Sequence, residues 1–150
     1  MSQIIRTHLT INAAPDVLWE ALLHLPGYSA WNPFITAASG DVTVGRRLDL
    51  TIDPVGGPRM TVRPWVTDVQ PYGYLEWLGR MTVPGLLDGR HSFSLTPMSR
   101  SRTLLQQSAT FTGILTPLAG ATFARVRAGF LAMNVALAHH VGGSVDLDLS

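Results

Sequence analysis

The sequence contains no cysteine and no lysine, and these two absences exclude several kinds of protein chemistry. Without cysteine the chain has no disulfide framework, no thiolate nucleophile and no zinc ribbon. Without lysine it cannot form a Schiff base through a protein amine, which excludes lysine aldolases and pyridoxal enzymes. Any chemistry must therefore rely on other side chains.

Charge is also scarce in this chain. Charged residues make up 14% of the 150 residues, hydrophobic residues make up 46%, and the formal net charge is +1. The 11 basic residues, all arginine, are scattered and form no basic stripe of the kind that binds nucleic acid. No apolar run approaches the roughly 18 residues of a membrane span, and the first residues lack a signal-peptide pattern. We therefore expect a cytoplasmic protein without nucleic-acid binding or stable membrane insertion.

Turn residues divide most of the chain into short elements. Residues 3–12 have a strand pattern, and residues 15–25 have helical apolar spacing that begins with a proline. A second short helical segment ends at Asn32-Pro33, because the residue before proline avoids the α region. Further strands are predicted at 47–52, 59–70, 74–81, 86–97 and 102–112, with Pro64 marking an edge or a bulge in one of them.

The last element is a long helix predicted over residues 117–141. Thr116 is a suitable N-cap, Pro117 is a suitable first helical residue, and Gly142-Gly143 ends the helix. An apolar stripe recurs along it at intervals of three and four residues. The stripe consists of Phe123, Val126, Phe130, Met133, Leu137 and Val141.

Two interior glycines and a short terminal segment complete the helical region. Gly120 and Gly129 each cost about 1 kcal/mol relative to alanine in a helix, which points to close backbone approach by a neighbouring element. Residues 144–150 are expected to form a loose tail. No repeat, low-complexity tract or linker is present, so residues 1–150 are expected to form one domain.

Four local motifs, in order along nearly the whole chain, resemble those of the START-like (SRPBCC) superfamily. They are Ile11-Asn12-Ala13-Ala14-Pro15 followed by Trp31-Asn32-Pro33-Phe34; Gly89-Arg90-His91-Ser92-Phe93-Ser94-Leu95; Phe111-Thr112-Gly113-Ile114-Leu115; and Gly129-Phe130 with Met133-Asn134. The resemblance implies the α+β helix-grip fold. In that fold a curved antiparallel sheet of six to seven strands wraps around the long C-terminal helix, and two short helices follow the first strand.

One position departs from the resemblance. Close relatives usually carry a glutamate in the last strand where this chain has Ala109, so any role of that carboxylate does not carry over. The superfamily includes polyketide cyclases and dehydratases, lipid carriers and Hsp90 activators. The resemblance therefore implies a hydrophobic cavity without specifying its use.

Strand alternation indicates which polar side chains face the interior. His91 shares parity with Phe93, and the hairpin register places it near Gln107. An imidazole beside an amide can orient a ligand or transfer a proton; equally, it can be a structural histidine bonded to that amide. Five of the ten carboxylates can be placed, and each has the outward parity or lies on an outward helix face, which leaves no acid–base pair inside and favours binding over catalysis. They are Glu20, Asp49, Asp53, Glu76 and, unless a bulge intervenes, Asp88.

Aromatic and helical side chains complete the candidate site. Trp31 and Phe34 are expected near the cavity mouth, and Trp77 and Phe93 on its floor, although core packing explains all four equally well. Asn134 lies beside the apolar stripe, so its amide needs a partner, either backbone near the Trp31-Asn32 loop or a ligand.

The leading hypothesis is a protein that binds a small lipophilic or polycyclic molecule, with no metal and no cofactor. The alternatives are a cyclase or dehydratase that uses His91 as acid or base, and an interaction module of the Hsp90-activator type. The predicted ligand-binding residues are Trp31, Phe34, Trp77, His91, Phe93, Gln107, Phe130, Met133 and Asn134. No sequence pattern indicates an oligomeric state.

Overall fold

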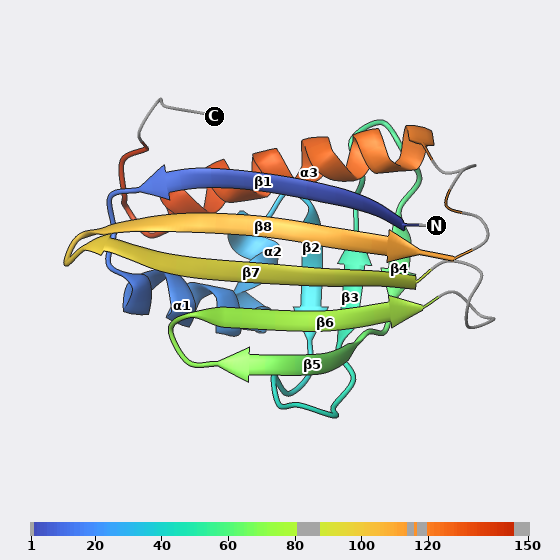
Figure 1. The fold of residues 1–150 in the computed structure, drawn as a ribbon, viewed down its shortest axis with the longest axis horizontal. Coiled ribbons are helices and arrows are strands. Elements are labelled where there is room, and N and C mark those ends of the chain that lie inside the picture. The colour runs from blue at the N-terminus through green and yellow to red at the C-terminus, as the bar shows by residue number, and fades with distance from the viewer. Residues whose placement is uncertain (1, 81–87, 114–115, 117–119, 146–150) are drawn as a thin grey trace.

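The computed structural model describes the chain except for residues 1, 81–87, 114–115, 117–119 and 146–150 (Figure 1). Two antiparallel sheets contain its named strands. The larger has the order β1-β8-β7-β6-β5 and the smaller the order β2-β3-β4.

The element bounds follow the predicted order. The large sheet consists of β1 (Ser2–Ile11), β5 (Trp65–Gln70), β6 (Tyr74–Arg80), β7 (Asp88–Ser99) and β8 (Arg102–Thr112). The small sheet consists of β2 (Ile35–Ser39), β3 (Asp49–Ile52) and β4 (Met60–Val62). The helices are α1 (Pro15–Leu23), the 3₁₀ turn η1 (Leu25–Gly27), α2 (Tyr28–Trp31) and α3 (Gly120–His140).

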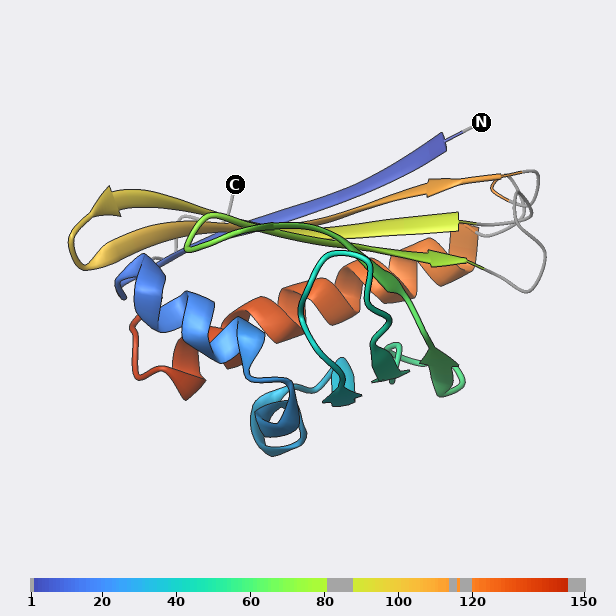
Figure 2. The same ribbon diagram turned by 90° about the horizontal axis from the view of Figure 1, so that it is seen from below.

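The helices and the small sheet cover one face of the large sheet. Figure 2 shows α1, α3 and the small sheet together on that side, and Figure 1 shows the strands of the small sheet crossing those of the large one. The core lies between these layers, where inward side chains of β1, β7 and β8 meet α3. The predicted α+β class, with an antiparallel sheet, two short helices after the first strand and a long C-terminal helix, is confirmed.

Pro64 explains why the strands fall into two sheets. The pattern over residues 59–70 predicted one strand, but the chain leaves the small sheet after β4 and enters the large sheet at β5. Proline has no N–H to donate to a ladder, so the strand is interrupted there. Backbone bonds from Leu48 N to the Pro64 carbonyl and from Val66 N to the Arg46 carbonyl, both 2.8 Å, join the two sheets around this break.

The predicted alternation along β7 and β8 is confirmed. His91, Phe93 and Leu95 are buried on β7, and the buried residues of β8 alternate with partly exposed ones from Thr103 to Ala109. On the outer face Glu76 accepts hydrogen bonds from Thr67, Tyr74 and Arg90 at 2.8 to 2.9 Å. The inner face is therefore apolar with a few polar side chains, and the outer face is polar.

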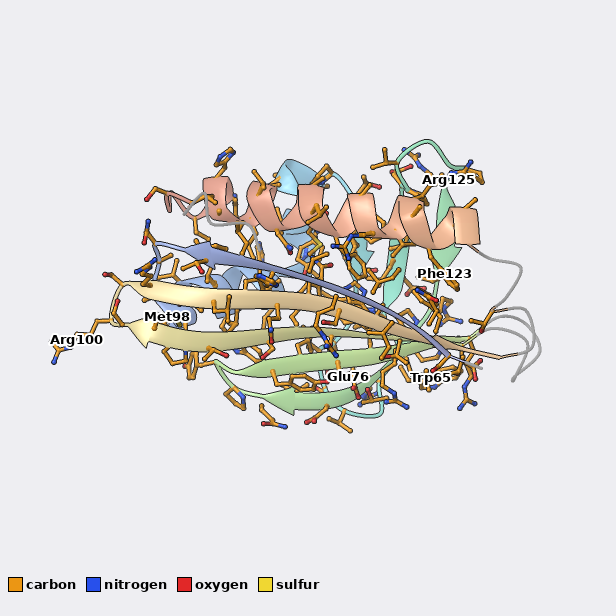
Figure 3. All side chains as sticks on the ribbon, turned by 45° about the horizontal axis from the view of Figure 1, so that its top comes forward. Trp65, Glu76, Met98, Arg100, Phe123 and Arg125 are labelled. Carbon is orange, nitrogen blue, oxygen red and sulfur yellow. The ribbon has the colours of Figure 1, made fainter. Side chains whose placement is uncertain are left out.

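The helix α3 presents its predicted apolar stripe to the sheet. Figure 3 shows Phe123 pointing toward the sheet and Arg125 pointing away from it. The helix ends as expected: Gly142 has φ +76°, and the N–H groups of Gly142 and Gly143 donate to the carbonyls of His139 and Ala138. The described helix begins at Gly120, and Pro117, predicted as its first residue, lies outside the described residues. No helix in the described part of the chain is long and apolar enough to cross a membrane.

The segment after α3 differs from expectation where it is described. Ser144 and Val145 were predicted to begin a loose tail. Instead, the Ser144 carbonyl accepts from Asn12 N at 2.9 Å, its hydroxyl accepts from the Asn12 amide at 2.8 Å, and Val145 forms an antiparallel bridge with Ile11. The remainder of the predicted tail, 146–150, lies outside the described residues.

Candidate functional site

A cavity of about 230 Å³ lies between β6–β8 of the large sheet, β3–β4 of the small sheet and α3. Its lining side chains are apolar except for Arg80, His91 and Thr122. A second hollow, of about 280 Å³, lies between the start of β1 and α3, but most of its lining residues are solvent-exposed, so it is a surface groove. The first cavity is therefore the candidate site.

Four of the nine predicted residues line this cavity: Phe34, Trp77, His91 and Phe130. The other five do not. Phe93 and Met133 are buried in the core, and Gln107 and Asn134 belong to a polar network behind His91. Trp31 was expected near the mouth of the cavity, but its ring stacks on His140 at 5.3 Å between centroids and packs edge-on to Tyr28. The α2 turn directs this indole toward the end of α3 instead.

The polar network connects three strands to α3. The His91 Nε2 atom lies 2.9 Å from Gln107 Oε1, and Gln107 Nε2 lies 2.7 Å from Asn134 Oδ1. Asn134 Nδ2 lies 3.0 Å from Thr7 Oγ1, and that hydroxyl lies 2.9 Å from the Gln107 carbonyl. Every member is buried, so the network meets the requirement that enclosed polar groups find partners.

This network supplies the partners of two predicted site residues. His91 does contact Gln107, although the residue directly opposite it on β8 is Ala109 and Gln107 lies diagonally. The expected partners of Asn134, backbone near the Trp31-Asn32 loop or a ligand, are replaced by Gln107 and Thr7. Thr7 was not predicted as a site residue, but its inward parity in β1, between buried Ile5 and Leu9, was a signal that could have identified it.

The imidazole of His91 is enclosed by aromatic rings. Its centroid lies 4.8 Å from that of Phe93, 4.7 Å from Phe130 and 4.9 Å from Trp77. Burial among these rings lowers the pKa of His91 from 6.5 to about 4, and the hydrogen bond with Gln107 opposes this shift only in part. The ring is therefore neutral near neutral pH.

No carboxylate of the described residues lines the cavity. Asp49 and Asp53 pair with Arg63 and Arg59 at 2.9 and 2.8 Å, and no hydrogen bond joins a carboxylate to His91 within the described residues. None of the described His, Asp and Glu side chains form a group of three that could hold a metal ion. The site thus combines an apolar space with one buried, neutral imidazole and the side chains of Arg80 and Thr122.

Sequence reasoning missed the wall supplied by the small sheet. Leu50 and Ile52 of β3 and Met60 and Val62 of β4 line the cavity. Alternation along 47–52 did identify an apolar face with Leu50 and Ile52, but it did not show which cavity that face would line. The division into two sheets was the missing information.

The fold of this chain is similar to that of several solved structures. The ZhuI aromatase/cyclase of a Streptomyces species superposes with a TM-score of 0.78 at 18% identity, covering 95% of this chain and 94% of that chain. A START superfamily protein of Mycobacterium smegmatis gives a TM-score of 0.73 at 16% identity, covering 93% of this chain and 97% of the other. Norcoclaurine synthase of Thalictrum flavum gives a TM-score of 0.68 at 16% identity, with 94% of each chain covered. At these identities the likeness shows the fold alone.

The sequence itself matches a family. No curated protein matches it, but the family model described as polyketide cyclase/dehydrase and lipid transport matches residues 2–139. That match extends over nearly the whole chain and includes every element from β1 through most of α3. The chain therefore belongs to the polyketide cyclase/dehydrase and lipid transport family, within the START-like superfamily that its motifs resemble.

Proposed function

We propose that this protein binds a small lipophilic or polycyclic molecule in the cavity between its two sheets and α3. The observation that carries the proposal is the wall itself: apolar side chains from both sheets and the helix, interrupted at depth by the buried imidazole of His91. Binding sites for small molecules commonly have this composition, with apolar walls and few polar groups.

A cavity of this size favours an aromatic ligand. An engineered apolar cavity of about 150 Å³ binds benzene, so one of about 230 Å³ accommodates a larger ring system. Phe34, Trp77 and Phe130 contribute aromatic rings to the wall, and Phe34 packs edge-on against Phe130. Aromatic rings in offset or edge-to-face contact attract each other beyond the effect of buried area alone.

A second candidate is a cyclase or dehydratase in which His91 acts as acid or base. The family membership and the similarity to an aromatase/cyclase favour this candidate. The environment of His91 weighs against it, because catalysis of proton transfer is most efficient when the pKa of the group lies near the working pH. With a pKa of about 4, His91 in the free protein is neutral near neutral pH, so it lacks the acidic imidazolium proton that a general acid would donate and is only a weak base.

The proposal is tested by mass spectrometry of the freshly purified protein under native and then denaturing conditions. A stoichiometric small molecule that leaves on denaturation supports binding and identifies the ligand. The Ala109→Leu variant, which places a larger side chain in the cavity wall opposite His91, is expected to lose that molecule. Thr110→Leu, on the outer face of the same strand, is the matched control. Equal occupancy in both variants would place the ligand elsewhere.

His91→Gln separates the two candidate functions. Glutamine keeps a hydrogen-bonding side chain but cannot cycle a proton near neutral pH. Lost turnover with retained ligand affinity would favour the enzyme. Reduced affinity without any detectable turnover of the ligand in the wild type would favour the binding protein.

A further inference from the structure

We propose that the ligand of this cavity carries a hydrogen-bond donor, such as an aromatic or enolic hydroxyl, which it donates to Nδ1 of His91. This inference rests on the proposed function and specifies the chemistry of its ligand. It follows from the direction of the hydrogen bonds in the network behind His91, which a single backbone carbonyl determines.

The direction of the network is set at Thr7. A backbone carbonyl oxygen can only accept, so the hydroxyl of Thr7 donates its one proton to the Gln107 carbonyl, 2.9 Å away. The same hydroxyl oxygen must then accept from Asn134, 3.0 Å away. The atom of Asn134 that faces Thr7 is therefore its amide nitrogen, and the amide oxygen faces Gln107.

The orientation of the Asn134 amide fixes that of the Gln107 amide, which in turn decides which partner donates in the hydrogen bond to His91. Since Asn134 presents its oxygen, Gln107 must present its nitrogen, which donates across 2.7 Å. The carbonyl of Phe130, 3.4 Å from the same nitrogen, supports this orientation independently, because it too can only accept. The oxygen of Gln107 therefore faces His91, and His91 must donate to it from Nε2 across 2.9 Å.

A neutral imidazole has one N–H, and the network uses it. With the proton on Nε2, the other ring nitrogen, Nδ1, carries a lone pair and can only accept. Burial among three aromatic rings keeps the His91 imidazole neutral near neutral pH. Nδ1 therefore does not take up a second proton, which would turn it from an acceptor into a donor. The ring thus presents an acceptor wherever Nδ1 is accessible.

The accessible side of Nδ1 is the cavity. Nδ1 has no hydrogen-bond partner among the described residues. It is also absent from the described side-chain atoms that are both fully buried and without a partner, so Nδ1 keeps some accessible surface. Those atoms belong to Asn32, Asp88 and Thr116. His91 as a whole is 9% exposed and lines the cavity, so we assign the accessible surface of Nδ1 to the cavity.

The consequence is a preference among otherwise similar ligands. A hydroxyl places its proton on Nδ1 and satisfies the acceptor. A methyl group in the same place leaves Nδ1 without a partner, and an ether or ketone oxygen brings a second lone pair against it. A site that bonds a hydroxyl discriminates strongly against analogues that lack it, because its own polar group is then left unpaired.

The first test reads the tautomer directly in the ligand-free protein. In ¹⁵N-labelled wild type at neutral pH, the ring nitrogen with a one-bond coupling to a proton identifies the protonated site. We expect a proton on Nε2 of His91 and none on Nδ1. A proton on Nδ1 would overturn the inference whatever the ligand, and it would leave the proposed binding function untouched.

The second test uses two probes of similar shape, 2-naphthol and 2-methylnaphthalene, in titrations with the wild type and with His91→Phe. We expect the wild type to favour 2-naphthol by about tenfold relative to His91→Phe, which corresponds to one net hydrogen bond. Comparing the ratio between proteins cancels the difference in hydrophobicity of the two probes. His139→Gln, an exposed histidine substitution on α3, serves as the control and should keep the wild-type ratio.

The outcomes separate the inference from the function on which it rests. Binding of both probes with the same ratio in wild type and His91→Phe would overturn the inference while supporting the cavity as a binding site. Failure of both probes to bind the wild type would overturn the proposed function and the inference with it, and binding of 2-methylnaphthalene without 2-naphthol would overturn the inference alone. If His91→Phe does not fold, the tautomer measurement still decides the question.

Discussion

Replacing Gly129 by alanine tests how α3 is packed against the cavity wall. A Cβ at this position would lie 2.5 Å from Cε1 and 2.9 Å from Cγ of Phe34, and closer still to Cδ1. Since ordinary contact begins at 3.4 Å, the ring has to retreat by about an ångström. Phe34 is buried and lines the cavity, so the open space available to it is the ligand site itself.

Two opposing terms set the expected magnitude. Overpacking of a core site costs about 1–3 kcal/mol, and the exchange of an interior helical glycine for alanine returns about 1 kcal/mol. Gly129→Ala should therefore lower the free energy of unfolding by up to about 2 kcal/mol. Gly120, for which no atom lies within 4 Å of the added Cβ, is the matched control, and Gly120→Ala should be neutral or stabilising by up to about 1 kcal/mol.

Urea unfolding followed by tryptophan fluorescence measures both variants, with unchanged m-values as the sign that only stability has altered. The cause is isolated in a Phe34→Ala background, where the ring is absent and Gly129→Ala should become stabilising by about 1 kcal/mol. If Gly129→Ala stabilises the wild-type background as Gly120→Ala does, Phe34 does not occupy the surface of α3 and the packing argument is wrong.

Three further outcomes are expected. The lowered pKa of His91 means that the unfolded chain gains a proton between pH 6.5 and about 4 that the folded protein does not, so the free energy of unfolding should fall by roughly 3 kcal/mol as the pH falls through this window. Urea titrations across the window should show this loss in wild type and not in His91→Phe. Asn134→Leu leaves the Gln107 amide short of an acceptor and should cost about 1–3 kcal/mol in the same assay, whereas the exposed Val135→Ala should change stability by less than about 0.5 kcal/mol. Gly142→Ala forces a side chain to adopt φ +76° with no steric neighbour and should lower the thermal stability by an amount equivalent to about 1–2 kcal/mol, and an unchanged melting temperature would contradict the assigned helix end.

Features encoded locally were predictable from the sequence. The inward position of His91 followed from two-residue alternation along β7, and the end of α3 at Gly142 followed from the preference for glycine in a left-handed conformation. The interior glycines show the limit of such reasoning. Both were expected to mark close approach, but only Gly129 has a neighbour at contact distance, because Phe34 is brought there by the tertiary fold.

Features that depend on register between distant elements were not predictable. Pro64 was recognised as an irregularity in one strand, yet its effect is to send β4 and β5 into different sheets. The partner of Asn134 was expected to be backbone near the Trp31-Asn32 loop or a ligand, whereas its partners lie on β1 and β8. In each case the residue was identified correctly as unusual, and its partner was set by packing that no local pattern records.

The hydrogen-bond network also ties the formation of the site to the last steps of folding. Thr7 and Asn134 are 127 positions apart, and Thr7 and the Gln107 carbonyl are 100 positions apart. Contacts of such separation require closure of nearly the whole chain, which is entropically costly and slow. Until the first strand and the last helix meet, nothing imposes a single orientation on the side-chain amides, and His91 is free to exchange its proton between its two nitrogens. A chain whose first strand and last helix have not yet met therefore has the residues of the site but not its recognition chemistry.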